Sequence, residues 1–527
     1  MNSSKPDSWF FTFAGLKSKS LRFLRSRPYV SILIANLLFI QYMAWLYFSG
    51  LFIDWEELII EPYLIVNGFN NYKDIATQHA PLLTDLLAIV YRLFGTGIYV
   101  RIVLLIVVSL SVSVLTFLVT SKLAGRRAGI LAILFLAIFW PYYGGTNFWF
   151  DTFIAAFYLI ACLLIIKRSS STSYFIAGIS LGISFLFKQS SGVLALAVCI
   201  ILLIRNEDFK NRVRNILIYS VGVLTPIILL IAWYAYKGLL KDAYYWTIEY
   251  NLSGIYASLA KVWPPVDERI RLIIVVVPIL LALIRVALSI GKRGNVTWDF
   301  WFVLVMGFFA AFTIFPRWER WHVAPSVPFL VIGLVLSIGQ LRKGLENSKY
   351  IIFYRLGKAV LVVWFVVVFV NIGLHYPPLL LDRIIPNFSR QWPFHSYASP
   401  DWVDEHFLRF NGDIPAIGKF IKSSTSEKDK IYVWGWGGER IYRESDRLPA
   451  GKFYYALPWY TCLPRFKNDL SEAFEKDRPN FVIILKRQFP RTPTLTALGI
   501  DLKKMHFSRL DHLEDRFPEV IIWKSDT

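Results

Sequence analysis

The sequence predicts an α-helical polytopic membrane protein with about eleven spanning helices and an α/β domain at its carboxyl end. Of its 527 residues, 55% are hydrophobic and only 18% are charged, whereas soluble domains contain about 25% charged residues. Apolar runs of the roughly 20 residues needed to cross a bilayer recur from Tyr29 to Gly373 and then stop. The residues that follow have the length of one soluble domain.

The apolar runs are expected to be helices. Backbone polar groups cannot face lipid unpaired, so a span is a helix or part of a closed barrel, and apolarity without alternation favours helices. The expected spans are 29–50, 98–120, 128–143, 149–166, 172–187, 191–204, 216–236, 270–290, 298–315, 324–340 and 357–374. The expected organisation is an amino-terminal segment 1–28, a membrane module 29–373 with a long loop 54–97, and a domain 374–527.

The distribution of basic residues predicts the orientation. Loops on the side of the amino terminus hold 21 Lys and Arg residues, and the opposite loops hold 9. Cytoplasmic loops are enriched in these residues, so we expect a multi-pass protein of the cytoplasmic membrane with its amino terminus inside and its C-terminal domain outside. The net charge of +20 is explained by basic loops facing anionic membrane lipid, which argues against nucleic acid as a partner.

The pattern of the C-terminal domain differs from that of the membrane module. IYVWGW, NFVIIL and EVIIWK are short β-branched and aromatic runs, and LSEAFEKD resembles a surface helix. The segment GWGG at 435–438 lacks the third glycine of a dinucleotide site, so a tight turn is expected. Trp434, Trp436 and nearby tyrosines either stack on sugar rings or pack the domain, and packing is the favoured interpretation.

Acidic residues gather directly after the first span, in LFIDWEELIIEPYLIVNGFNNYKDIATQHAPL at 51–82. Asp54, Glu56, Glu57 and Glu61 either form the polar end of an interfacial helix or belong to a functional site. For Glu61 the solvated helix face is the favoured interpretation.

Three further polar segments lie on the same predicted side of the membrane. WPYYGGTNFWFDT contains Asp151, FLFKQSSG contains Lys188, and FPRWERWHVAPSVPFL contains Arg317, Arg320 and His322. Snorkelling side chains in an aromatic belt are the simpler explanation. However, carboxylates suit a general base or a divalent cation, and cations suit a phosphate, so together they indicate a site for a phosphorylated lipid. Nucleotide-binding and common hydrolase motifs are absent from the sequence.

The spacing within the first loop resembles that of a known family. Asp54 is followed fourteen residues later by Gly68, then by Tyr72-Lys73-Asp74 and His79-Ala80-Pro81-Leu82. This order resembles the first outer loop of GT-C class membrane glycosyltransferases, in the branch of dolichyl-phosphate-mannose protein mannosyltransferases and the lipid A aminoarabinose transferase.

The chain departs from that pattern at two positions. Trp55 stands where the family has Glu, which leaves Glu56 or Glu57 to replace this carboxylate, and Ala80 stands for a Pro. Later segments also resemble the family in order: Asp151 opening the fourth span, Lys188 in its turn, PRWERWHVAPSVPFL, and DKIYVWGWGGERIYRESDRLPAGKFYY at 429–455.

The resemblance implies transfer of a sugar from a polyprenyl-phosphate donor to a glycan, lipid or protein acceptor at the outer face of the membrane. Because an acceptor hydroxyl is a poor nucleophile, it needs a base, for which Asp54 is the candidate. The other expected residues are Asp151 as a second catalytic carboxylate, Lys188, Arg317, Arg320 and His322 for the lipid phosphate, and Glu56, Glu57, Tyr72, Asp74 and His79 as auxiliary residues. Asp54, Asp151 and His79 are candidate ligands of a divalent metal ion.

Two other functions fit parts of the sequence. A transporter or flippase of polyprenyl-linked glycans suits eleven spans, but such proteins often contain internal repeats with broken helices at the midplane, and no obvious repeat is found. A binding or scaffold protein would leave Asp54, Asp151 and Lys188 unexplained.

Overall fold

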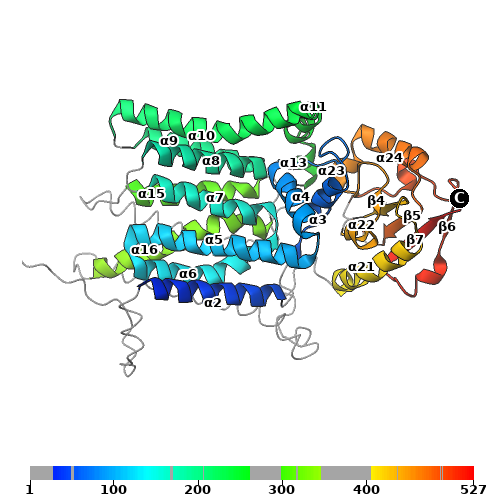
Figure 1. Cartoon of the computed structure of the whole chain (residues 1–527), viewed down its shortest axis with the longest axis horizontal. Helices are drawn as coiled ribbons and strands as arrows, with labels where there is room; N and C mark the ends of the chain where they lie inside the picture. Colours follow the sequence, from blue (N-terminus) through cyan, green and yellow to red (C-terminus); the bar gives the residue numbers. More distant parts are fainter. Residues whose placement is uncertain are drawn as a thin grey trace, which may run out of the picture.

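The structure, a computed structural model, describes most of the membrane module and the C-terminal domain. A bundle of long, roughly parallel helices forms one end of the molecule, and the C-terminal sheet domain forms the other, beyond α3 and α4 (Figure 1). The described residues are 28–48, 53–166, 170–205, 207–260, 298–315, 319–345, 405–435, 437–486, 488 and 491–526.

The long helices of the bundle follow the apolar runs of the sequence. They are α2 Pro28–Phe48, α5 Ile98–Ala124, α6 Arg126–Tyr142, α7 Phe150–Ile165, α8 Ser171–Phe187, α9 Gly192–Leu203, α10 Phe209–Tyr236, α15 Trp298–Ala310 and α16 Val327–Leu345. Each expected span within the described residues coincides with a helix, whereas the expected spans 270–290 and 357–374 lie outside them.

Only some of these helices have the dimensions of a complete membrane span. In the described part of the chain, Ile98–Ala124, Phe209–Tyr236 and Trp321–Ile338 are long and apolar enough to cross a membrane, and the other apolar helices are shorter. The number of about eleven spans therefore stays a prediction. One face of α10 suits lipid, because Ile228 and Leu229 on it are 59% and 66% exposed.

Two glycines allow the backbones of α8 and α10 to pack closely together. A Cβ atom added to Gly178 would lie 2.1 Å from the carbonyl oxygen of Tyr219, and one added to Gly222 would lie 2.2 Å from that of Phe175. Glycines at helix contacts allow backbones to approach in this way within membranes. The close packing of α8 supports the turn that follows it, which carries Lys188.

Short elements connect the bundle and cover its end beside the C-terminal domain. In the 54–97 loop, α3 covers Glu56–Val66 and α4 covers Leu82–Phe94. The others are η1 Gln189–Ser191, α11 Leu240–Tyr244, the π-helical turn η2 Tyr245–Glu249, α12 Tyr250–Leu252, α13 Ile255–Ala260, η3 Ala311–Ile314 and η4 Arg320–Ser326.

A small parallel strand pair links two loops of the module. β1 Ile53–Asp54 pairs with β2 Asn147–Phe148, with Ile53 opposite Asn147 and Asp54 opposite Phe148. Because Phe148 lies three residues before Asp151, this pairing brings the start of the 54–97 loop to the amino end of α7.

The C-terminal domain contains one mixed sheet, as the sequence predicts. Its strands are β3 Lys430–Trp434, β4 Leu448–Pro449, β5 Phe481–Leu485, β6 Phe507–Arg509 and β7 Val520–Ser525, in the order β4-β3-β5-β7-β6. β4 and β5 run parallel to β3, and β7 runs antiparallel to β5 and β6. The helical elements are α21 Glu405–Ser423, α22 Arg440–Ser445, α23 Pro458–Thr461, α24 Pro464–Lys476, η6 Thr496–Leu498 and η7 Asp511–Leu513.

The aromatic residues of this domain form its core and its contact with the membrane module. Trp434, Tyr454 and Tyr455 are at most 2% exposed. They belong to one apolar cluster that also includes Ile59 of α3 and Trp246 of η2. The interpretation of these aromatic residues as packing residues is therefore confirmed, while Trp436 lies outside the described residues.

Candidate active site

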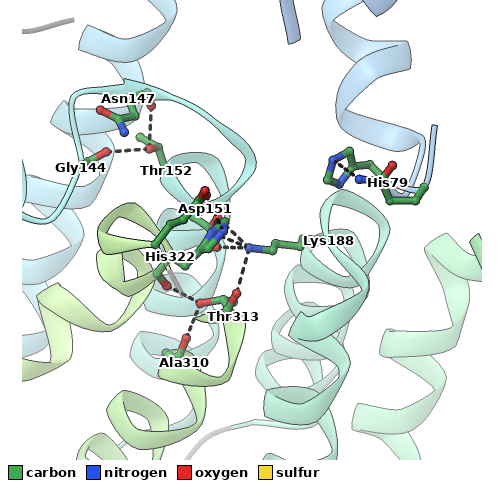
Figure 2. Close-up of polar contacts among 11 residues, drawn as sticks. His79, Gly144, Asn147, Asp151, Thr152, Lys188, Ala310, Thr313 and His322 are labelled. Atoms are coloured by element: carbon green, nitrogen blue, oxygen red, sulfur yellow. Dashed lines mark hydrogen bonds and ion pairs between the residues drawn. The ribbon is translucent and has the colours of Figure 1, made fainter. Parts of the chain in front are cut away.

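Asp151, Lys188 and His322 form a buried cluster of charged and polar groups (Figure 2). Nζ of Lys188 lies 2.8 and 2.7 Å from the two carboxylate oxygens of Asp151, and Nδ1 of His322 lies 2.6 Å from Oδ2. The three residues are 0%, 9% and 6% exposed. Charges buried this deeply persist only when paired and hydrogen-bonded, so each member of the cluster requires the others.

Three separate parts of the bundle supply this cluster. Asp151 lies in the first turn of α7, where the helix dipole favours a negative charge. Lys188 lies between α8 and η1, and its Nζ also donates to the carbonyl oxygen of Thr313 at 3.0 Å. The Thr313 hydroxyl donates in turn to the carbonyl oxygen of His322 at 2.6 Å, which connects η3 to η4. Nε2 of His322 lies 3.3 Å from Oε2 of Glu319.

The backbone of the candidate base Asp54 lies next to the segment that leads into α7, the helix that carries Asp151. Its strand pairs with β2, immediately before α7, while its side chain lies outside the described part of the structure. The next residue, Trp55, packs against Trp149 and Trp321, with ring centroids 5.6 and 4.6 Å apart. Trp55 stands where the resembled family has Glu. Its ring therefore packs the 54–97 loop against the two segments that contain Asp151 and His322.

His79 lies against the amino end of α7. Its ring stacks on Phe150 at a centroid distance of 4.4 Å and meets the edge of Trp149 at 5.4 Å. Burial, together with the charges of Lys188 and His322, lowers the pKa of His79 to about 3, so the ring is neutral.

The other auxiliary residues of the loop have structural contacts. The Tyr72 hydroxyl donates to the carbonyl oxygen of His79 at 2.7 Å. Oδ2 of Asp74 accepts hydrogen bonds from the backbone and side-chain nitrogens of Asn70, so this carboxylate stabilises the turn. Of the candidate phosphate-binding residues, Arg317 and the side chain of Arg320 lie outside the described residues.

The acidic residues of α3 are buried toward the C-terminal domain. Glu61 is 0% exposed and accepts hydrogen bonds from Tyr454 at 3.0 Å and Thr84 at 3.4 Å. Burial raises the pKa of Glu61 to about 8. The interpretation of Glu61 as a solvated helix face is wrong, because the C-terminal domain covers this face of α3.

Glu56 and Glu57 are also buried, each 7% exposed, and they lie close enough to Glu439 of the C-terminal domain to influence its ionisation. Burial, with the charges of Glu56 and Glu57, raises the pKa of Glu439 well above its usual value. Sequence reasoning did not select Glu439, although it directly follows the GWGG segment that resembles the family.

The described side chains provide no metal site. They contain no group of three or more His, Cys, Asp and Glu residues that could hold a metal ion. Both oxygens of Asp151 are held by Lys188, and one also by His322, so this carboxylate does not fit a metal ligand in this arrangement. We therefore derive no step through a metal ion.

Sequence reasoning also missed two residues around the cluster. Thr313 contributes a backbone carbonyl, for which a sequence carries no signal. Gln78 lies beside His79, within the segment that resembles the family, and its role depends on a contact with the C-terminal domain.

Comparison with known proteins identifies the fold. Residues 78–255 match the family model described as dolichyl-phosphate-mannose-protein mannosyltransferase. ArnT from Cupriavidus metallidurans, solved with bound undecaprenyl phosphate, aligns with a TM-score of 0.54 and 13% identity, over 94% of this chain and 97% of that chain. The chain shares the fold of ArnT. The predicted resemblance to this branch of the GT-C class is thereby confirmed.

Two further solved structures align with the chain. The apo form of ArnT from the same organism aligns with a TM-score of 0.51 and 12% identity, over 96% of this chain and 98% of that chain. The apo oligosaccharyltransferase of Archaeoglobus fulgidus aligns with a TM-score of 0.48 and 12% identity, over 88% of this chain and 70% of that chain. The comparison with curated proteins found no match.

Proposed function

We propose that this protein transfers a sugar from a polyprenyl-phosphate donor to an acceptor hydroxyl at the outer face of the membrane. The observation that supports this function best is the buried cluster of Asp151, Lys188 and His322, which lies next to the strand pair that carries Asp54. The ArnT structure with bound undecaprenyl phosphate adds support for a donor of this chemical class.

The proposed reaction is an inverting displacement at the anomeric carbon. The acceptor oxygen forms the new bond to this carbon, the bond to the phosphate oxygen breaks, and polyprenyl phosphate leaves with the electron pair. Asp54 takes the proton of the acceptor hydroxyl. Lys188, with Arg317 and Arg320, stabilises the negative charge that develops on the phosphate.

Asp151 acts through Lys188 in this proposal. Its carboxylate and the carbonyl oxygen of Thr313 hold Nζ of Lys188 in one position. These three oxygens use the three N–H donors of Nζ, so a phosphate that binds Lys188 directly must replace one of them while the others keep the ammonium group in position. Asp151 is therefore proposed as a positioning residue, and His322 completes the cluster around it.

The test is an assay of sugar release from a labelled polyprenyl-phosphate donor, with the full chain in lipid nanodiscs. We expect the wild type to release sugar and the variant Asp54→Asn to release none while remaining folded. Asp208→Asn, which removes an exposed carboxylate at the start of α10, is the matched control and should behave as the wild type. Movement of the donor lipid between leaflets without any release of sugar would instead identify a flippase.

A further inference from the structure

Trp149 lies between the two parts of the candidate site. The residue before it, Phe148, pairs with Asp54 in the strand pair of β1 and β2. Trp149 itself is the N-cap of α7, and Asp151 lies in the first turn of that helix. Because Asp151 holds Nζ of Lys188, Trp149 connects the candidate base to the candidate phosphate-binding cation within a short stretch of chain.

The indole ring of Trp149 contacts side chains from the other segments of the site. Its centroid lies 5.6 Å from that of Trp55 in the 54–97 loop. It lies 5.4 Å from the ring of His79, whose plane is nearly perpendicular to the indole, and 6.4 Å from the ring of His322 in η4. Trp149 is 7% exposed, so the residues of the candidate site enclose its ring.

The indole nitrogen of Trp149 is a buried hydrogen-bond donor. Among the residues that the structure describes, none accepts a hydrogen bond from Nε1 of Trp149. An indole N–H only donates, so the direction of any hydrogen bond it makes is fixed, unlike that of a hydroxyl. Burial of such a donor without an acceptor costs free energy, because the hydrogen bond that it would make with water is lost.

Trp140 shows how a buried indole is satisfied inside the bundle. This residue lies near the end of α6 and is 0% exposed, and its Nε1 donates to Oγ of Ser109 in α5 at 3.2 Å. Trp149 is buried almost as deeply, but its donor meets no acceptor among the described residues. Packing therefore accounts for the ring of Trp149 and does not account for its N–H group.

The proposed reaction locates the sugar beside Trp149. In an inverting displacement, the acceptor oxygen approaches the anomeric carbon from the side opposite the leaving phosphate, so the sugar lies between the base and the phosphate-binding cation. These two groups are Asp54 and Lys188, and Trp149 lies between the residues that position them. A neutral N–H suits a sugar hydroxyl, whereas a phosphate forms stronger hydrogen bonds with a charged donor such as Lys188.

We propose that Trp149 binds the sugar of the donor, with its indole N–H donating a hydrogen bond to a hydroxyl oxygen of that sugar. The inference rests on the proposed function, to which it adds a residue that recognises the sugar. A sugar without a hydroxyl at the matching position would leave this N–H unpaired and should bind less tightly. Trp149 thereby discriminates among polyprenyl-phosphate-linked sugars, whereas Lys188 recognises the phosphate that all of them share.

Two lipids that differ only in the sugar test this assignment. The full chain in nanodiscs is titrated with undecaprenyl phosphate and with a panel of undecaprenyl-phosphate-linked hexoses and pentoses, of which the one bound most tightly is used with the variants. We expect Trp149→Phe to weaken binding of this sugar-linked lipid about tenfold, the effect of one lost hydrogen bond. Binding of undecaprenyl phosphate should be unchanged.

Trp140→Phe is the matched control, since it removes an indole N–H that Ser109 already accepts. It should change the binding of neither lipid. A tryptophan analogue with sulfur in place of the indole nitrogen, introduced at position 149, keeps the size of the ring and should reproduce the effect of Trp149→Phe. This analogue decides the result if Phe disturbs the packing around Trp55 and His79.

The hydrogen bond itself can be observed by solid-state NMR of the protein labelled with nitrogen-15 in its 19 tryptophans. Trp149→Phe identifies the indole signal of Trp149. We expect the N–H proton signal of Trp149 to move downfield with the sugar-linked lipid and to stay in place with undecaprenyl phosphate, because a hydrogen bond deshields the proton. The signal of Trp140, assigned in the same way, should not move with either lipid.

Three results would overturn the inference. Equal weakening of both lipids by Trp149→Phe would assign the N–H group to the phosphate, and weakening of neither would leave Trp149 with a packing role only. An indole signal of Trp149 that stays in place with the sugar-linked lipid would exclude the hydrogen bond. A wild type that binds neither lipid and releases no sugar would instead refute the proposed function, and this inference with it.

Discussion

Nζ of Lys188 lies 2.7 and 2.8 Å from the carboxylate oxygens of Asp151, although 37 positions separate the two residues in the sequence. Both side chains are buried, so neither charge is stabilised by bulk water. A pair of this kind contributes little net stability compared with apolar residues, but loss of one partner leaves the other charge buried and unpaired. Its presence next to β1 and β2 is therefore better explained by function than by stability.

Lys188→Met tests this explanation directly. We expect it to abolish transfer and to lower the free energy of unfolding by about 3–5 kcal/mol, because the Asp151 carboxylate would lose its main counter-charge. The double variant Lys188→Met/Asp151→Leu should recover most of that stability and none of the activity. Denaturant unfolding in detergent and the sugar-release assay measure the two effects. Recovery of activity in the double variant would exclude Lys188 from the reaction.

The raised pKa of Glu61 should make the stability of the protein depend on pH. Its pKa rises from 4.5 to about 8 on folding, so the folded protein holds a proton there that the unfolded chain releases between these values. The contribution of Glu61 to stability is complete below about pH 4.5 and is lost as the pH rises to about 8. Glu61→Gln should remove this component and stabilise the protein at pH 8. The measurement is the difference in melting temperature between wild type and variant across this range, with the exposed Glu475→Gln as control.

Trp55 is expected to hold the first loop against the rest of the site. Trp55→Ala removes a ring that is 8% exposed and packs against Trp149 and Trp321, which should lower the free energy of unfolding by about 3–5 kcal/mol. Transfer should fall as well, because the strand that carries Asp54 immediately precedes this ring. Trp55→Phe, which keeps an aromatic contact, should retain more of both. Equal activity of the Ala and Phe variants would show that the packing does not position Asp54.

The contact between α8 and α10 predicts a steric effect at a single position. Gly178→Ala places a methyl group 2.1 Å from a backbone oxygen, so the helices must separate, at a cost of about 1–3 kcal/mol. Gly97→Ala is the matched control, since a Cβ atom there meets nothing within 4 Å. Thermal unfolding in nanodiscs distinguishes the two variants, and equal melting temperatures would contradict the close contact.

Apolar composition alone was enough to predict the helices α5, α7 and α8, because a continuous apolar run has few alternatives to a helix in a membrane. Short runs of β-branched and aromatic residues likewise predicted β3, β5 and β7. The polar segments on one predicted side of the membrane, together with the resemblance, selected Asp151, Lys188 and His322 as members of one site, and the structure brings them into contact.

The burial of Glu61 and the contact of Gln78 with Tyr460 depend on residues that are much further apart in the sequence. Glu61 and Tyr454 are 393 positions apart, and Gln78 and Tyr460 are 382 apart. The sequence of α3 alone does not show whether its acidic face is buried or solvated, because burial depends on which other part of the protein covers that face. Only docking of the C-terminal domain removes that face from water, which raises the pKa of Glu61.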